Sequence, residues 1–142
     1  ILKLERQIKL IHRSLRNIRI NHIRKFVSEL VKKQPEYIAI EDLNVKGMMK
    51  NKHLSKSVQQ QGLYEFRRQI EYKSDWNHIP VIIADRYFPS SKLCICCGTI
   101  KNDLKLSDRI YRCDCGNTID RDFQASLNLK TYGEDVLQQS IA

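Results

Sequence analysis

Apolar residues recur at helical spacing along the first part of the chain. They fall at steps of three and four residues, and the same periodicity continues beyond Asn21 with a shifted phase. The first series is Leu4, Ile8, Ile11, Leu15 and Ile18, and the second is Ile23, Phe26, Val27, Leu30 and Val31. Such spacing places apolar side chains on one face of an α-helix. The pattern therefore predicts one long amphipathic helix over residues 4–33, with the change of phase as the site of a bend and Pro35 as its end.

Two short apolar runs, residues 37–40 and 80–85, predict strands that are buried on both faces. Between them, residues 61–76 show helical spacing, and Tyr72 and Trp76 are expected in the core or at its edge. A strand, a helix and a second strand within some fifty residues imply a right-handed crossover that joins a parallel pair. The predicted fold class is therefore α/β.

The remaining segments carry weaker patterns. Residues 45–60 read as a loop, either a flap over nucleic acid or a solvated linker, because turn-favouring residues interrupt any periodicity there: Gly47, Asn51 and Ser55. A last helix is predicted from Asp120 to about Thr131, and the tail over residues 134–142 shows no motif.

Composition and charge narrow the class of protein. The chain has 142 residues, 42% of them hydrophobic and 29% charged, which suits one cytoplasmic domain with a small satellite. No apolar run approaches the length of a membrane span, so a membrane protein is not expected. The net charge is +9, and residues 1–34 carry +8 of it, with ten Lys or Arg against two Glu.

Four basic residues of the first helix repeat at its helical spacing and form a stripe: Arg6, Lys9, Arg13 and Arg16. A local excess of positive charge attracts polyanions, because each neutralised phosphate releases counterions. The basic stripe is therefore the candidate contact for nucleic-acid phosphates, with a plain solvated helix face as the alternative.

Five cysteines lie in two clusters, each closed by a glycine that lets the chain turn back. The pairs are Cys94 and Cys97, then Cys113 and Cys115. Four thiolates at such spacings can bind one tetrahedral zinc ion, so we interpret residues 93–118 as a zinc ribbon. Disulfides and plain buried thiols are the alternatives, but the cysteine count is odd and no signal-peptide pattern occurs. Cys96 is expected to stay a free thiol.

An acidic residue closes the first predicted strand. A carboxylate at the end of a buried strand is costly unless something neutralises it, and open α/β sheets place their sites at strand ends. Glu41 is therefore a candidate metal ligand, and a simple loop cap is the alternative role. Asp42 is the other candidate, although strand alternation turns its side chain to the opposite face. Asp85 ends the second predicted strand in the same way.

Four segments together resemble the C-terminal half of the transposon-encoded TnpB/OrfB proteins: residues 38–48, 65–73, 87–92 and 120–128. That family comprises RuvC-like, RNA-guided DNA endonucleases related to the type V CRISPR effectors. The resemblance extends over nearly the whole chain, with two departures. The second cysteine pair is Cys-x-Cys where Cys-x-x-Cys is usual, and Gln124 and Ser126 stand where Asn and Ala usually follow the catalytic Asp.

The resemblance implies an RNase H-like (RuvC) fold with a zinc ribbon inserted between its second and third catalytic motifs. It implies Glu41 and Asp122 as catalytic carboxylates that bind Mg²⁺ or Mn²⁺, DNA as the substrate and a guide RNA as a partner. Asp120 is then left as a helix cap, and Asn128 as a support for Asp122. The RuvC-like core is expected over residues 1–92 and 119–142, on either side of the ribbon.

The family's first catalytic motif, an Asp on an earlier strand, has no counterpart here. Upstream of Glu41 the acids are Glu5, Glu29 and Glu36, all in or at the end of the first predicted helix. The sequence therefore predicts two of three catalytic carboxylates and no cleavage by this chain alone. A start at Ile1 within a helical pattern favours a fragment of a longer transposon-encoded endonuclease. The alternative is a non-catalytic zinc-ribbon protein that binds nucleic acid, from a truncated transposon gene.

Overall fold

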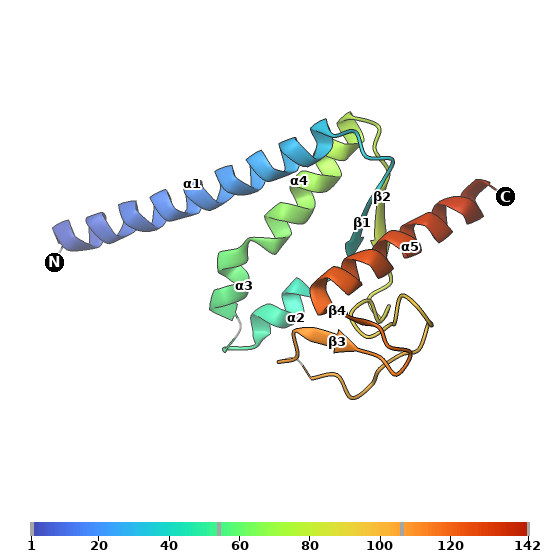
Figure 1. The fold of residues 1–142 in the computed structure, drawn as a ribbon. Helices are drawn as coiled ribbons and strands as arrows, with labels where there is room; N and C mark the ends of the chain where they lie inside the picture. Colours follow the sequence, from blue (N-terminus) through green and yellow to red (C-terminus); the bar gives the residue numbers. More distant parts are fainter. Residues whose placement is uncertain (1, 54, 106, 142) are drawn as a thin grey trace. The chain divides into compact units, whose positions relative to one another are not determined.

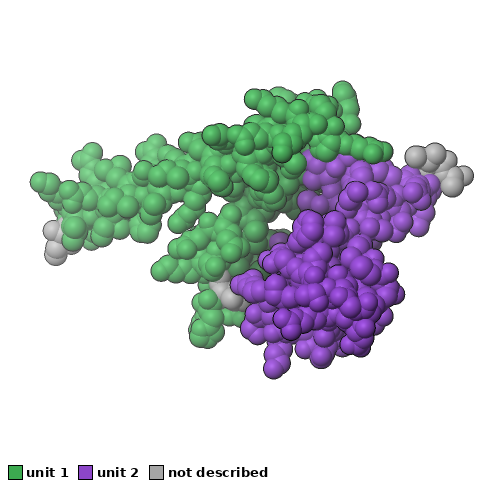
Figure 2. Space-filling view, viewed as in Figure 1, with its two compact units in different colours: residues 1–36, 44–81 green, residues 37–43, 82–142 purple. Residues whose placement is uncertain are grey.

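The computed structural model describes residues 2–53, 55–105 and 107–141. The chain divides into two compact units, coloured separately in Figure 2. Unit 1 comprises Ile1–Glu36 and Asn44–Val81, and unit 2 comprises Tyr37–Leu43 and Ile82–Ala142. Leu54 of the predicted loop, Leu106 of the predicted ribbon and the terminal residues Ile1 and Ala142 lie outside the described residues.

Unit 1 is helical. Its elements are α1 (Leu2–Lys32), α2 (Val45–Lys50), α3 (Ser55–Gln61) and α4 (Leu63–Trp76). The predicted first helix is confirmed as one uninterrupted element, and it packs along α4 (Figure 1). Lys73 Nζ of α4 donates to the Arg24 carbonyl of α1 at 3.1 Å, and the rings of Phe26 and Phe66 lie 5.8 Å apart.

Of helix α1, the second half contributes to the core of unit 1 and the first half does not. This half buries Ile23, Val27 and Val31, whereas the five apolar residues of the first series are exposed. Tyr72 and Trp76 were expected in the core or at its edge, but they are 47% and 70% exposed, and their rings lie 4.6 Å apart near the end of α4.

The ranges 45–50 and 55–61 are the helices α2 and α3, so the prediction of a loop over residues 45–60 was wrong. Asn44 caps α2 by accepting a hydrogen bond from the Gly47 amide at 2.9 Å. The Asn44 side chain lies where a Cβ at position 47 would stand, so a glycine that resembles a helix breaker is needed within this helix. Gly62, in the left-handed region with φ of 65°, separates α3 from α4.

Unit 2 combines strands with one long helix. Strands β1 (Ile38–Glu41) and β2 (Val81–Ala84) pair in a two-stranded sheet, and Figure 1 shows both arrows pointing the same way, as predicted for a parallel pair. Strands β3 (Ile110–Arg112) and β4 (Thr118–Asp120) pair antiparallel, with Tyr111 opposite Ile119. Helix α5 (Arg121–Ile141) packs against β1, β3 and β4.

Helix α5 ends about ten residues later than predicted, since it continues past Gly133 to Ile141. A Cβ at position 133 would collide with the Tyr37 ring, and the Tyr37 hydroxyl donates to the Lys130 carbonyl at 2.8 Å. The glycine therefore admits a neighbouring ring rather than ending the helix. The resulting architecture is mixed α/β, and no described helix has both the length and the apolar character of a membrane span.

Candidate functional site

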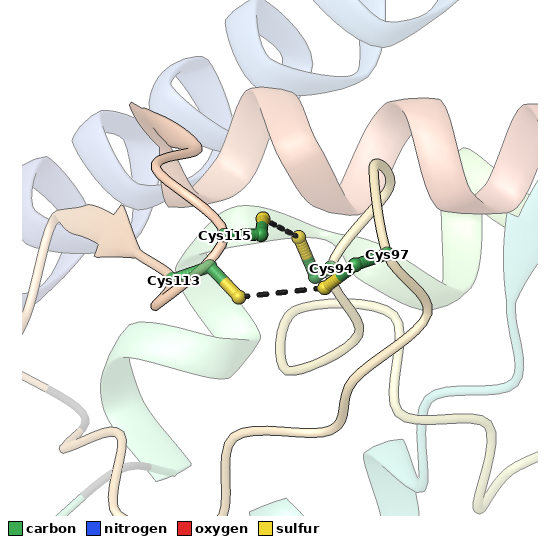
Figure 3. Close-up of side chains that lie close together, drawn as sticks. All are labelled: Cys94, Cys97, Cys113 and Cys115. Carbon is green, nitrogen blue, oxygen red and sulfur yellow. Dashed lines mark hydrogen bonds between the residues drawn. The ribbon is translucent and has the colours of Figure 1, made fainter.

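Four cysteines of unit 2 converge on one point (Figure 3). Their Sγ atoms all lie within 4.8 Å of one another, and the distances from Cys94 to Cys115 and from Cys97 to Cys113 are 3.7 and 3.6 Å. This is the set that the spacing predicted, and its sulfur atoms can hold a metal ion. All five cysteines are free of disulfides, and Cys96 is exposed outside the cluster.

Two hairpin turns bring the pairs together. The first follows an antiparallel bridge between Leu93 and Ile100, and the second connects β3 to β4. Gly98 and Gly116 have φ values of 72° and 92°, a left-handed conformation that glycine adopts without steric cost. Each glycine therefore turns the chain back directly behind a cysteine.

The thiols of the cluster differ in acidity. Burial opposes ionisation of Cys94, but hydrogen bonds from the amides of Cys97 and Cys96 and from Asn117 outweigh it and lower the pKa of the Cys94 thiol to about 6. A hydrogen bond with Thr99 is the main cause that lowers the pKa of the Cys97 thiol. The cluster therefore supplies thiolates readily on the side of the first pair.

Cys115 behaves in the opposite way. The Asn117 amide favours its thiolate, but contacts with the sulfur atoms of Cys113 and Cys97 dominate and raise the pKa of Cys115 to about 12. Tyr111 is fully buried nearby, and burial, followed by the neighbouring thiolates, raises the pKa of its hydroxyl to about 12. Without a metal, the cluster thus retains at least one proton near neutral pH.

Asn117, in the turn before β4, and Gln124, in the first turn of α5, form a polar pair beside the cluster that the spacing of the cysteines did not indicate. Asn117 Nδ2 lies 3.6 Å from the sulfur of Cys94, within hydrogen-bond range for sulfur. The same group donates to Oε1 of the fully buried Gln124 at 2.8 Å. Gln124 therefore links the first turns of α5 to a cysteine of the cluster.

Glu41 is the last residue of β1, as predicted, and is exposed. One of its oxygens accepts a hydrogen bond from the Ser90 hydroxyl. The neighbouring Asp42 forms an ion pair with Arg86. Among the described residues no ion pair engages Glu41, which favours it over Asp42 as the residue available to a metal.

The two acids that open α5 have different surroundings. Asp120 Oδ1 accepts from the amides of Asp122 and Phe123, each at 2.9 Å, which confirms Asp120 as the helix cap. The Asp122 carboxylate is 75% exposed, and its oxygens lie 4.0 Å from Arg109 and 3.9 Å from Arg121, at the limit of an ion pair. Asp122 is therefore open to a cation that competes with two guanidinium groups at the limit of ion-pair distance.

Asn128, expected as a support for Asp122, instead binds the backbone of the segment before the first cysteine pair. It is almost fully buried, and Nδ2 donates to the carbonyls of Ser90 and Leu93, each at 2.7 Å. Ser90 in turn donates to Glu41, and Leu93 precedes the first cysteine. Through Asn128, helix α5 thus hydrogen-bonds the segment that runs from Ser90, the partner of Glu41, to the first cysteine of the cluster.

The basic stripe belongs to unit 1. All four of its side chains are exposed on α1, and Arg16 lines a hollow in that unit. The structure therefore places the stripe on the surface of α1.

The chain is similar to several known proteins. Residues 64–129 match the family model described as "Cas12f1-like, TNB domain". A relative from Streptomyces pristinaespiralis, named "Putative RNA-guided DNA endonuclease", is 35% identical over 131 residues, which is 92% of this chain and 32% of the relative. InsQ of Escherichia coli (strain K12), which bears the same description, is 32% identical over 151 residues, covering 95% of this chain and 37% of InsQ. This chain corresponds to the C-terminal part of the TnpB/OrfB family.

A solved structure supports the fold of this TnpB/OrfB segment. The cryo-EM structure of the Cas12f1-sgRNA-target DNA complex includes a chain that matches 90% of this one with a TM-score of 0.68 and 20% identity. The match covers 37% of the Cas12f1 chain, and the curated relatives are likewise about three times longer than this TnpB/OrfB segment.

Proposed function

We propose that the chain is the C-terminal part of a transposon-encoded, RuvC-like DNA endonuclease whose complete form is guided by RNA. The observation that most supports this proposal is the order of three features within unit 2. Glu41 ends β1, the cysteine cluster follows, and Asp122 opens α5, which packs on β1. The parallel pair of β1 and β2 and the helix beside it would form one part of an RNase H-like sheet.

Zinc is the metal that suits the cysteine cluster. A tetrahedral ion with Zn–S bonds of about 2.3 Å requires sulfur atoms about 3.8 Å apart. The Sγ–Sγ distances of 3.7 Å between Cys94 and Cys115 and 3.6 Å between Cys97 and Cys113 lie close to that spacing. An all-sulfur set leaves no open position, so the ion would have a structural role.

Glu41 and Asp122 are the residues that would hold Mg²⁺ or Mn²⁺, since these hard ions prefer carboxylate oxygens. When bound, such ions supply an activated water and stabilise the leaving oxygen of the phosphodiester. Ser90 orients the Glu41 carboxylate through its hydrogen bond, and Asp120 fixes the first turn of α5 from which Asp122 projects.

The partners follow from the relatives. Their names include RNA-guided DNA endonuclease, and the Cas12f1 chain was solved with sgRNA and target DNA. We extend DNA and a guide RNA to this chain as partners of the complete protein, because the chain spans about a third of those relatives.

Metal analysis of the purified chain tests both sites. The expected zinc content is about one ion per chain, unaffected by Cys96→Ser and lost with Cys94→Ser. Mn²⁺ titration, followed by the electron paramagnetic resonance signal of free Mn²⁺, should then show weak binding that Glu41→Gln or Asp122→Asn lowers about fivefold.

The matched control is Asp42→Asn, which removes a carboxylate already paired with Arg86. Zinc content near zero, or Mn²⁺ affinity that depends on Asp42 and not on Glu41, would reject this placement of the metal sites. A zinc-loaded chain that never binds Mn²⁺ would favour the non-catalytic zinc-ribbon alternative.

A further inference from the structure

The two units differ sharply in charge. Unit 1 contains 17 Lys or Arg and six Asp or Glu, a net charge of +11, whereas unit 2 contains eight against ten, a net charge of −2. The charge excess of the protein therefore belongs entirely to the helical unit. A surface of this charge is complementary to a polyanion.

Within unit 1, a hollow of about 950 Å³ collects part of this charge. Helix α1 contributes His12, Arg16 and Arg19 to its lining, and α3 contributes Lys56. In the part of the chain that the structure describes, no ion pair joins Arg16, Arg19 or Lys56 to a carboxylate. These three cations are therefore available to a ligand.

The acid in the same lining does not cancel them. Glu65 lies 2.9 Å from Arg68 and accepts a further hydrogen bond from Gln69. The Arg68 hydrogen bond is the main cause that lowers the pKa of Glu65, so its charge is already compensated within α4.

The hollow also presents an aromatic ring. Tyr64, in the first turn of α4, lines it and is 72% exposed. Much of the remaining wall is aliphatic, contributed by α1, α2 and α4. The cations can bind phosphates, while the exposed ring and the apolar wall can contact the faces of unstacked bases.

We propose that this hollow binds an unpaired polynucleotide strand, with Arg16, Arg19 and Lys56 on its phosphates and Tyr64 stacked on a base. A duplex offers the same phosphates but keeps its base faces stacked inside, so it could use the cations without the ring. The inference rests on the nucleic-acid partners of the proposed function and names the surface and strand form that they would use.

Fluorescence anisotropy with the zinc-loaded chain tests the proposal. The probes are a labelled 20-nucleotide single strand, as DNA and as RNA, and a labelled 20-base-pair duplex, each titrated at several salt concentrations. The wild-type chain should bind the single strands more tightly than the duplex, and the two single-strand arms show whether the 2′-hydroxyl matters.

Two sets of variants separate the phosphate and base contacts. Arg16→Gln with Arg19→Gln and Lys56→Gln should weaken single-strand binding about a hundredfold at 0.1 M salt and reduce the log–log salt slope by about 2. Tyr64→Ala should weaken single-strand binding about tenfold with an unchanged slope, and Tyr64→Phe should restore it.

The charge-matched control is Lys25→Gln with Lys32→Gln and Lys33→Gln, which removes three cations of unit 1 outside the hollow. Circular dichroism and zinc content check that every variant is folded. The proposal is overturned if the control weakens binding as much as the hollow variant, if the duplex binds more tightly than the single strands, or if Tyr64→Ala leaves single-strand binding unchanged. Such a result leaves the metal sites of unit 2 standing, because their tests use no nucleic acid.

Discussion

Asn117 contacts the cysteine cluster without being one of its four metal-ligand candidates. Its amide group reaches both the Cys94 sulfur and Gln124 Oε1, so it restrains a thiolate from outside the ligand set. Groups that hydrogen-bond to metal ligands fix the ligand orientation and commonly change metal affinity by one or two orders of magnitude.

Asn117→Ala should therefore lower zinc affinity about 10- to 100-fold, measured by competition with a chelator. Gln124→Met keeps the volume of the side chain but removes the oxygen that orients Asn117, so it should lower the affinity by a smaller factor. Cys96→Ser is the control and should leave the affinity unchanged. Equal affinities for all four proteins would show that Asn117 only fills space.

The acidity of the thiols predicts a pH dependence of zinc binding. Cys115, whose pKa is about 12 in the metal-free protein, still carries its proton at pH 7–8 and must release it to the metal. The apparent association constant should thus rise at least about tenfold per pH unit in this range. Below about pH 6 the slope should steepen, because Cys94, with its pKa of about 6, then binds a proton as well. Calorimetry in buffers of different ionisation enthalpy counts the released protons, and zero release at pH 7.5 would contradict the prediction.

At the scale of elements, α5 organises unit 2. Asp122 offers a carboxylate in its first turn, and Gln124 holds Asn117 beside the cysteine cluster. Further along the helix, Asn128 binds the segment over residues 90–93, and Gly133 leaves room for the Tyr37 ring. The helix therefore positions the strand that carries Glu41 and the cysteine turns together.

The sign of the stability change caused by Gly133→Ala tests how closely the Tyr37 ring packs on α5. Alanine in the middle of a helix normally stabilises it relative to glycine, by about 0.5–1 kcal/mol. Here the new methyl group collides with the Tyr37 ring, so the variant should instead destabilise the protein by about 1–3 kcal/mol in urea unfolding. Combining it with Tyr37→Ala should remove the clash, and a stabilised single variant would show that the ring is not packed there.

The sequence predicted the elements with strong periodicity and missed those set by distant contacts. Helix α1, both short apolar strands and the cysteine set were predicted because spacing alone carries that information. The expected burial of both strand faces was wrong for β2, where Ile83 is 38% exposed. The two short helices over 45–61 were missed, since Asn44 and Gly47 resemble loop residues until the cap between them is seen. The roles of Asn117 and Asn128 depend on partners far along the chain, which no local pattern reveals.

The whole molecule separates its charges between two units. The helical unit carries +11, and the unit with the cysteine cluster and both candidate acids carries −2. This division suits a protein in which one unit attracts nucleic acid and the other holds divalent ions. The chain alone should nevertheless not cut DNA with Mg²⁺ or Mn²⁺, because two carboxylates offset only part of the charge of two ions. Cleavage of a plasmid by the purified chain that survives Glu41→Gln would contradict this prediction.

The most direct test is DNA cleavage by a protein of the relatives' full length that contains this chain, supplied with its guide RNA, a matching target and Mg²⁺. Glu41→Gln and Asp122→Asn should each abolish cleavage, while zinc content and nucleic-acid binding stay near those of the unchanged protein. Asp42→Asn and Asp120→Asn should retain most of the activity, because Arg86 and the helix amides already engage those acids. Cleavage that persists without Glu41 or Asp122 and disappears without Asp42 or Asp120 would show that the catalytic metals bind elsewhere.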